Sequence, residues 1–408
     1  MKLNASILRE YDIRGIVGET IGESDYHAIG KAFGTQLRLE GGESIAVCYD
    51  GRLSSPALES AIVEGLVTTG SRVVRVGCGP SPMCYFASHH IGTDAALMVT
   101  GSHNPPEYNG IKMNMLGRAF YGADIEAIGT RVADGNYTSG EGQVRNVSIL
   151  DKYVERLLQD FSGHKELRVA WDPGNGAAGQ VIEALVARLP GHHFVINAQI
   201  DGQFPNHHPD PTVEANLEQL KSAVDKERCD LGIAFDGDGD RIGLVDGQGR
   251  VLWGDQILVI LARPVLAELP GATIICDIKA SQLFQQEISR LGGKPLLWKT
   301  GHSHLKTKLA ETGAPLAGEM SAHIFFKHRY YGYDDAIYSA VRLLDILCNT
   351  EENLAEIRDS LPNYVNTPEI RFDCPEDRKF AIIEEVRGRL AKGNGYTVNN
   401  IDGVRVEN

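Results

Sequence analysis

The chain has 408 residues, of which 42% are hydrophobic and 23% charged, as in an ordinary globular protein. Its net charge of −14 argues against a general nucleic-acid binder and against a protein held on anionic membranes. The sequence shows no apolar run long enough for a membrane span, no secretory-leader pattern at its start and no C-x-x-C pair among its seven cysteines. We therefore expect a monomeric cytoplasmic protein with free thiols, and neither nucleic acid nor membrane as a partner.

Strand-like runs alternate with amphipathic stretches along the whole chain. Near the start, strands are predicted at 44–49, 72–77 and 94–99, with a helix over 55–70 that a glycine closes. Residues 167–189 are typical of a strand, a glycine-rich loop and a helix. The alternation continues with two strands joined by an acidic turn, three strand-and-loop stretches and a helix: 230–246, 272–281, 294–303, 314–326 and 334–347.

This alternation predicts an α/β fold in which helices cover mixed or parallel sheets. Polar or glycine-rich breaks occur near 135–150, 247–254 and 361–368. They divide the chain into four expected domains, at 1–150, 151–253, 254–366 and 367–408.

A serine stands on a rigid loop in the stretch VTGSHNPPEYNGIK, residues 99–112. The run before it indicates a buried strand, and Asn104-Pro105-Pro106 can form neither a helix nor a central strand. Ser102 therefore lies at the end of a strand, where the functional residues of α/β proteins usually lie. Taken alone, it could equally be a capping serine before a turn.

The acidic turn is FDGDGDRIG, residues 235–243. Asp236, Asp238 and Asp240 alternate with glycines, so that their carboxylates can converge on one point. Such a group repels itself unless a cation lies within it, and hard oxygen ligands select Mg²⁺ or Ca²⁺. An EF-hand loop is excluded because Arg241 and Gly247 stand where it requires Gly and Glu. A solvated Asp-Gly hairpin is the remaining alternative.

The serine and the acidic turn could act together in binding a cation. A phosphoserine carries a charge of about −1.5 to −2, so three aspartates with a phosphorylated Ser102 sum to about −5. A divalent cation then becomes nearly obligatory, and Mg²⁺ is the usual ion for neutralising a phosphoryl group in transit.

Two weaker signals complete the pattern. In GEMSAHIFF, residues 318–326, Glu319 and Ser321 could share one face of a loop and bind sugar hydroxyls, although a plain surface loop is the alternative. Basic residues also accompany the motifs. Each could be a solvated surface group, but together they could form a cationic pocket for a phosphorylated substrate: Arg14, Lys112, Arg241, Lys279 and His302.

The motifs YDIRG, TGSHNPPEYNGIK, DGDGDRIG and GEMSAH, with IDGQFPNHHPDP at 200–211, resemble in order and spacing those of the α-D-phosphohexomutase superfamily. The resemblance extends from residue 10 to about residue 370 and implies three mixed α/β domains around a central cleft, with an α+β fourth domain. It implies a phosphorylated Ser102 with His103 beside it, and Mg²⁺ bound by the Ser102 phosphate and by Asp236, Asp238 and Asp240.

The resemblance also implies roles for the surrounding residues. Lys112, Arg241 and Arg14 would lie around the transferring phosphoryl group. The substrate would be bound by Tyr11, Lys279, His302, Glu319, Ser321 and His323. Met320 stands where relatives acting on glucosamine phosphate have glutamine, so that glucose or mannose phosphates are the better expectation.

The implied activity is reversible phosphoryl transfer between positions 1 and 6 of a hexose phosphate, through a hexose 1,6-bisphosphate that is both intermediate and activator. The stretch 367–390 resembles only the start of the family's fourth domain, and the phosphate clamp that this domain carries has no counterpart before Asn408. We therefore expect residues 367–408 to be an incomplete phosphate-binding domain. A sugar-phosphate phosphatase and a binding module with reduced activity are the alternatives.

Overall fold

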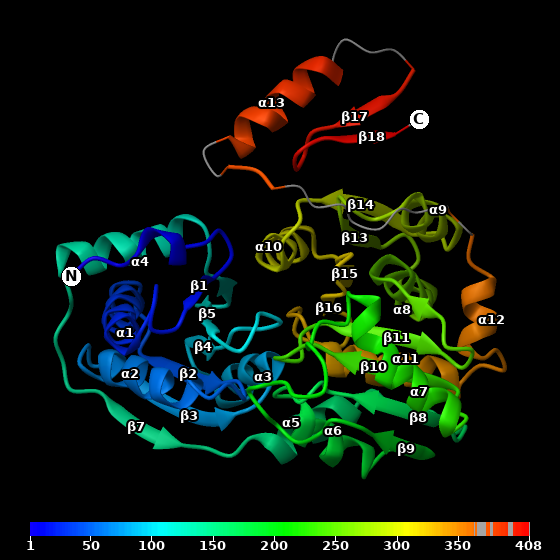
Figure 1. Cartoon of the computed structure of the whole chain (residues 1–408), viewed down its shortest axis with the longest axis horizontal. Coiled ribbons are helices and arrows are strands. Elements are labelled where there is room, and N and C mark those ends of the chain that lie inside the picture. Colours follow the sequence, from blue (N-terminus) through cyan, green and yellow to red (C-terminus); the bar gives the residue numbers. More distant parts are fainter. Residues whose placement is uncertain (363, 365–372, 376–377, 391–394, 408) are drawn as a thin grey trace.

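The computed structural model describes residues 1–362, 364, 373–375, 378–390 and 395–407. The predicted α/β class is confirmed, because helices alternate with strands that form a seven-stranded, a five-stranded and a four-stranded sheet, followed by a two-stranded sheet near the C-terminus. Figure 1 shows the small C-terminal part at the top, above β14. The expected domain boundaries stay predictions, and residues 367–372 lie outside the described residues.

The first sheet is mixed and has the order β1-β5-β4-β2-β3-β7, with β6 paired to β5. Strands β2 and β4 are buried apolar runs and pair in parallel, whereas β5 is antiparallel to both β4 and β1. The strands are β1 (Ile13–Ile16), β2 (Ser44–Tyr49), β3 (Arg72–Cys78), β4 (Ala95–Val99), β5 (Tyr108–Met115), β6 (Arg118–Ala119) and β7 (Gln143–Asn146). The helices are η1 (Ala5–Ile7), α1 (Glu23–Leu39), α2 (Ser55–Val67), α3 (Ser81–Ile91) and α4 (Ala123–Asp134).

The second sheet has the order β12-β11-β10-β8-β9. Its β10 and β11 form an antiparallel pair in which Phe235 faces Ile242, so the acidic turn is the tip of a hairpin. The strands are β8 (Arg168–Asp172), β9 (His192–Val195), β10 (Leu231–Phe235), β11 (Ile242–Asp246) and β12 (Val251–Leu252). The helices are α5 (Leu150–Leu158), α6 (Gly179–Val186), η2 (Glu214–Leu217) and α7 (Glu218–Lys226).

The third sheet has the order β14-β13-β15-β16, and the loop of the GEMSAH motif joins its antiparallel strands β15 and β16. The strands are β13 (Thr273–Asp277), β14 (Lys294–Trp298), β15 (Leu316–Gly318) and β16 (Ile324–Phe326). The helices are α8 (Gly254–Glu268), α9 (Gln282–Arg290), α10 (His302–Thr312), α11 (Ala336–Cys348) and α12 (Leu354–Asp359).

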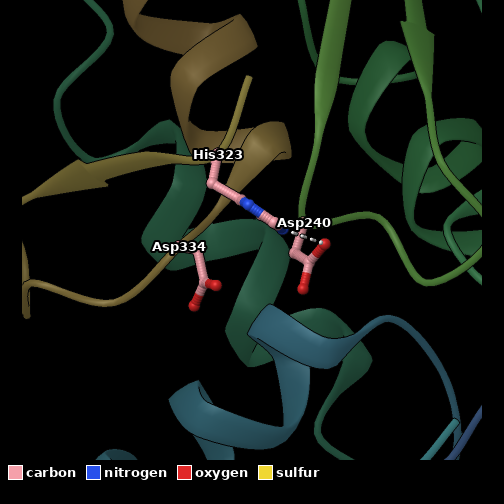
Figure 2. A group of neighbouring side chains, drawn as sticks. All are labelled: Asp240, His323 and Asp334. Carbon is pink, nitrogen blue, oxygen red and sulfur yellow. Dashed lines mark hydrogen bonds and ion pairs between the residues drawn. The ribbon is translucent and has the colours of Figure 1, made fainter. Parts of the chain in front are cut away.

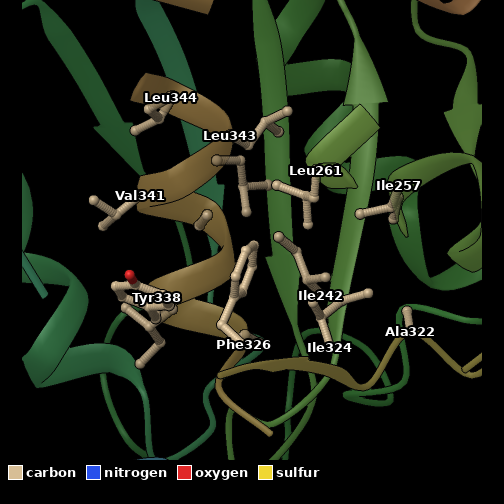
Figure 3. Close-up of a cluster of buried hydrophobic side chains, with 14 of the residues drawn as sticks. Ile242, Ile257, Leu261, Ala322, Ile324, Phe326, Tyr338, Val341, Leu343 and Leu344 are labelled. Carbon is tan, nitrogen blue, oxygen red and sulfur yellow. The ribbon is translucent and has the colours of Figure 1, made fainter. Parts of the chain in front are cut away.

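One hydrophobic core joins the second and third sheets to helix α3 of the first. Figure 3 shows part of it, where α11 packs with Phe326 against residues of β11, α8 and β16 such as Ile242, Leu261 and Ile324. This shared core ties together the elements that carry the three motif loops.

The C-terminal part consists of α13 (Lys379–Leu390) and the hairpin of β17 (Thr397–Asn399) and β18 (Arg405–Glu407). It contacts the third sheet through Arg405, which donates to the carbonyls of Ile278 and Ala280, and through Asp402, which accepts from the Thr300 amide at 2.9 Å. No residue of α13 is buried.

Other expectations can be compared with the structure. Helix α2 ends at Val67 rather than at Gly70, because the Thr68 and Thr69 hydroxyls bond back to carbonyls of its last turn. Each of the seven cysteines, all within the described residues, is a free thiol. Among the described helices, none combines the length and the apolar character that crossing a membrane requires.

Candidate active site

The loop of Ser102 connects β4 to β5. Ser102 is 2% exposed and has a φ of 49°, a left-handed conformation that a side chain rarely adopts without support from its surroundings. That support includes the Ser102 amide, which donates to the Thr100 hydroxyl at 2.8 Å. The prediction that Ser102 lies on a fixed loop at a strand end agrees with this geometry.

Arg52 anchors the loop, and it is not among the residues predicted from the sequence. Its guanidinium is buried and donates to four carbonyls of the serine loop, those of Ser102, Asn104, Pro105 and Tyr108. Asp50 accepts from Arg52 Nε at 3.1 Å and from the Thr100 hydroxyl at 2.8 Å. Both residues follow β2 in the stretch YDGR, and this position directly after a strand was the available signal.

The three aspartates of the acidic turn are all fully buried, which rules out the solvated hairpin. Their carboxylate oxygens lie within 4.8 Å of one another. Asp236 Oδ1 accepts from the amides of Asp240 and Arg241 at 3.0 and 3.1 Å. Among the described residues, Asp238 Oδ1 has no hydrogen-bond partner although it is buried.

The serine loop and the acidic turn meet directly. Ser102 Oγ donates to Asp236 Oδ2 at 3.1 Å and lies 3.2 Å from His103 Nδ1. A Cβ on Gly237 would lie only 2.4 Å from the Ser102 carbonyl oxygen, so the two backbones approach as closely as glycine allows. Ser81, at the start of α3, also donates to Asp238. Ser81 could not be predicted from the sequence because its partner lies 157 residues further along the chain.

Lys112, Arg241 and Arg14 all lie near this junction, and their role around a phosphoryl group stays a prediction. Lys112 Nζ donates to Asp238 at 2.7 Å and also to Asp240. Arg241 Nε lies 3.3 Å from His323 Nε2. Arg14 donates to Asp12 and to the side chain of Asn104 in the serine loop.

The GEMSAH loop adds a third face to the site. Glu319 is 2% exposed and His323 4% exposed, so this is not the plain surface loop that was the alternative. His323 joins two carboxylates, with Nδ1 2.6 Å from Glu319 and Nε2 3.1 Å from Asp240. The Ser321 hydroxyl donates to Glu319 at 3.0 Å.

The remaining predicted residues are less closely connected. The His302 ring lies 5.7 Å from the His323 ring and 6.2 Å from that of Tyr11, whose hydroxyl donates to the Thr300 carbonyl at 3.0 Å. Lys279 is exposed and lines a separate hollow of about 520 Å³ with residues of the C-terminal hairpin such as Arg405. Its role in substrate binding stays a prediction.

Burial and charge shift the pKa values of these groups in opposite directions. Burial and the neighbouring Asp240 and Asp238 raise the pKa of Asp236 well above its usual range. Burial by itself would lower the pKa of Lys112, but Asp238 and Asp240 outweigh it and raise the pKa. Burial, with Arg241 and Arg14, lowers the pKa of His103. His103 is therefore neutral and Lys112 charged.

The aspartate group fits a divalent cation. It offers oxygen atoms only, the ligands that Mg²⁺ and Ca²⁺ prefer, and the free Asp238 Oδ1 is a buried acceptor that lacks a donor. Burial and the neighbouring Asp240 and Asp238 all act against the charge of Asp236 by raising its pKa, and a bound cation would offset them. The buried aspartates can therefore bind a metal ion.

Comparison with known families decides the identity of the chain. Residues 5–138, 151–249 and 253–364 match the models of the alpha/beta/alpha domains I, II and III of phosphoglucomutase/phosphomannomutase. The chain belongs to this family. The resemblance to the α-D-phosphohexomutase superfamily is thereby confirmed, as is the expected enzyme class, a phosphohexomutase of the phosphomannomutase/phosphoglucomutase type.

Individual relatives of the family agree over nearly the whole chain. The phosphomannomutase/phosphoglucomutase of Pseudomonas aeruginosa is 43% identical over 99% of this chain and 87% of the relative. The phosphoglucomutase of Neisseria gonorrhoeae is 37% identical over 99% of this chain and 88% of the relative. A phosphoglucomutase/phosphomannomutase family protein of Burkholderia thailandensis superposes with a TM-score of 0.94 at 42% identity, covering 99% of this chain and 89% of that one.

Proposed function

We propose that this phosphohexomutase moves a phosphoryl group between positions 1 and 6 of glucose or mannose phosphate, through a phosphorylated Ser102 and a hexose 1,6-bisphosphate. The observation that carries the proposal is the direct contact of Ser102 Oγ with the buried aspartate group, at 3.1 Å from Asp236. A serine hydroxyl beside three buried carboxylates has no evident structural purpose, whereas a phosphoserine that shares a cation with them does.

Asp236, Asp238 and Asp240, together with the Ser102 phosphate, would hold Mg²⁺. When bound, this ion supplies neutralisation of the charge on the phosphoryl oxygens. The protein's own cations act on the same group from other sides. Lys112 is held protonated by two aspartates, and Arg241 reaches the junction from the acidic turn. Catalysis then depends mainly on positioning and on charge stabilisation.

In the first transfer, the bond between phosphorus and Ser102 Oγ breaks and a bond to a sugar hydroxyl oxygen forms. That hydroxyl gives up its proton, and Ser102 Oγ takes one. The second transfer runs in reverse and returns the other phosphate to Ser102 Oγ and a proton to the sugar oxygen. Lys112 or a histidine near the attacking hydroxyl is the candidate for this proton exchange. His103 Nδ1 lies 3.2 Å from Ser102 Oγ, and His323 lies on the side of the sugar-binding loop.

The sugar would bind beside the GEMSAH loop. Glu319 and Ser321 present a carboxylate and a hydroxyl that can exchange hydrogen bonds with vicinal hydroxyls, and His302 and Tyr11 border the same region. The bisphosphate would turn end over end there before it returns its other phosphate to Ser102.

The test follows both possible products in one reaction. Purified protein with Mg²⁺ and a trace of glucose 1,6-bisphosphate is given glucose 1-phosphate or mannose 1-phosphate, and hexose 6-phosphate and inorganic phosphate are measured together. We expect isomerised sugar in large excess, and its loss in Ser102→Ala. Inorganic phosphate in large excess would identify a phosphatase instead, and binding of the sugar phosphate without either product would identify a binding module.

A further inference from the structure

Asp334 and Asp335 are adjacent aspartates with separate roles. Asp335 caps helix α11, accepting from the Tyr338 amide at 2.8 Å. The backbone of Asp334 forms a single antiparallel β-bridge with Phe325, next to the GEMSAH loop, and its side chain is fully buried. Helix capping therefore accounts for one aspartate and leaves the other unexplained.

The Asp334 carboxylate has one satisfied and one unsatisfied oxygen. Its Oδ1 lies 3.2 Å from Lys306 Nζ on α10. Among the described residues, its Oδ2 has no hydrogen-bond partner, and neither has His302 Nδ1, which lies 3.7 Å away. Two buried polar atoms that each need a partner thus face each other, slightly beyond direct hydrogen-bond distance.

A metal ion is the first alternative for this region. Ligand atoms of Asp240, His323 and Asp334 lie within 4.8 Å of one another, and Figure 2 shows Asp334 beside the contact between the other two. However, both ring nitrogens of His323 already contact carboxylates, Nε2 that of Asp240 and Nδ1 that of Glu319. The ring therefore has no free nitrogen to bind a metal ion.

His302 is a neutral imidazole with one N–H to place. Burial, together with Lys306 and His323, lowers its pKa well below the usual range, and its position at the start of α10 acts in the same direction. The side chain is 12% exposed, and the exposed part is not the buried Nδ1. Nε2 is therefore the ring nitrogen that can meet a ligand.

We propose that Asp334 is a positioning residue that accepts the Nδ1–H of His302 and so fixes the tautomer in which Nε2 accepts a hydrogen bond from a substrate hydroxyl. The two atoms lie 3.7 Å apart, and such contacts are often long in a site without its substrate. The substrate half of this inference rests on the proposed function, whereas the tautomer does not.

Lys306 makes the best variant predictable. Because its ammonium group faces Oδ1, the side chain of an Asp334→Asn variant should turn its carbonyl oxygen to Lys306 and its NH₂ to His302. That NH₂ would donate to Nδ1 and force the proton onto Nε2. The variant should therefore invert the tautomer with almost no change in size, whereas Asp334→Ala would only remove the acceptor.

The experiment combines nitrogen NMR with a double-mutant cycle on the intact protein. In protein labelled with ¹⁵N-histidine, with the His302 signals assigned by their loss in His302→Gln, we expect the proton on Nδ1 in the wild type and on Nε2 in Asp334→Asn. With glucose 1-phosphate as the probe, kcat/KM of Asp334→Asn should fall by about tenfold to a hundredfold. The reason is that the Nε2–H donor of His302 would then face the hydroxyl donor of the substrate. In the His302→Gln background, Asp334→Asn should cause little further loss of kcat/KM.

Two results would overturn the proposal. One is a wild-type His302 that carries its proton on Nε2. The other is a set of fully additive kinetic losses, which would show that Asp334 acts independently of His302. If Asp334→Asn fails to fold, the tautomer in Asp334→Ala decides, since loss of the Nδ1–H preference is expected there. Absence of any isomerisation in the wild type would contradict the proposed function and leave the tautomer measurement to be judged by itself.

Discussion

At the scale of single residues, His323 shows how the site uses burial and charge against each other. Burial alone would lower the pKa of this imidazole, but Asp240 and Glu319 outweigh burial and raise it to about 9. In return, the pKa of Glu319, which burial alone would raise, falls to about 2 mainly because of His323. The ring is thus an imidazolium at neutral pH that joins the sugar-binding loop to the acidic turn.

This shift predicts a pH dependence of stability. A group whose pKa is higher in the folded than in the unfolded chain stabilises most below its unfolded pKa of about 6.5, and this contribution is lost as the pH rises toward about 9. The shift corresponds to about 3 kcal/mol. Urea denaturation at several pH values between 6 and 10 should show the wild type losing stability in this window, and His323→Gln losing much less. Parallel pH profiles for the two proteins would contradict the assignment.

A second prediction at this scale concerns the metal. Asp238→Asn removes one charge and one strong ligand from the aspartate group, so Mg²⁺ affinity should fall by more than about tenfold, together with activity. Isothermal titration with Mg²⁺ measures the first quantity and a coupled assay the second. Asp225→Asn, an exposed position on α7, is the matched control and should change neither. Activity that survives both Asp238→Asn and a chelator would mean that the turn holds no essential ion.

At the scale of elements, the serine loop and the acidic turn position most of the site residues, and Arg52 anchors the serine loop. Its side chain is fully buried and makes four carbonyl contacts and an ion pair with buried Asp50, so removing it leaves an unpaired carboxylate and several unsatisfied acceptors. Arg52→Met should lower the free energy of unfolding by about 3–5 kcal/mol. Arg72→Met, at an exposed arginine paired with exposed Glu43, should cost less than about 1 kcal/mol. Equal losses in chemical denaturation would refute the anchoring role.

The close approach of the serine loop and the acidic turn is testable at Gly237. A Cβ there would meet the Ser102 carbonyl oxygen at 2.4 Å, so Gly237→Ala must move the loops apart. We expect a fall in kcat of about a hundredfold, because small displacements of reacting groups are costly. Gly388→Ala on α13, where an added Cβ meets nothing within 4 Å, should leave activity unchanged. Near-normal activity in Gly237→Ala would show that the contact is not needed.

The same two loops show what the sequence could and could not predict. Strand ends, the serine loop and the aspartate turn are local patterns, so Ser102 and the three aspartates could be placed from the sequence alone. Arg52 could not, because its partners in the serine loop lie about fifty residues further along the chain. Asp334 could not either, since beside Asp335 it looks like part of a helix start, and only the packing of α10 brings His302 and Lys306 to it.

At the scale of the whole molecule, the site depends on contributions from three sheets. Ser102 comes from the first, the aspartates from the second, and Glu319 and His323 from the third. The shared core of the second and third sheets, which includes helix α3, holds these loops together. For this site to work as a mutase, a phosphate on Ser102 must be retained by the folded protein and must also be transferred to a sugar.

Intact-mass spectrometry tests that requirement most directly. The protein is first incubated with glucose 1,6-bisphosphate and freed of ligand, and then mixed with excess glucose 6-phosphate or with buffer. We expect the mass of one phosphate in the loaded protein, its loss on adding the sugar phosphate, its persistence in buffer, and none of these changes in Ser102→Ala. A wild-type chain that never gains the phosphate, or that gains it equally in Ser102→Ala, would contradict the account.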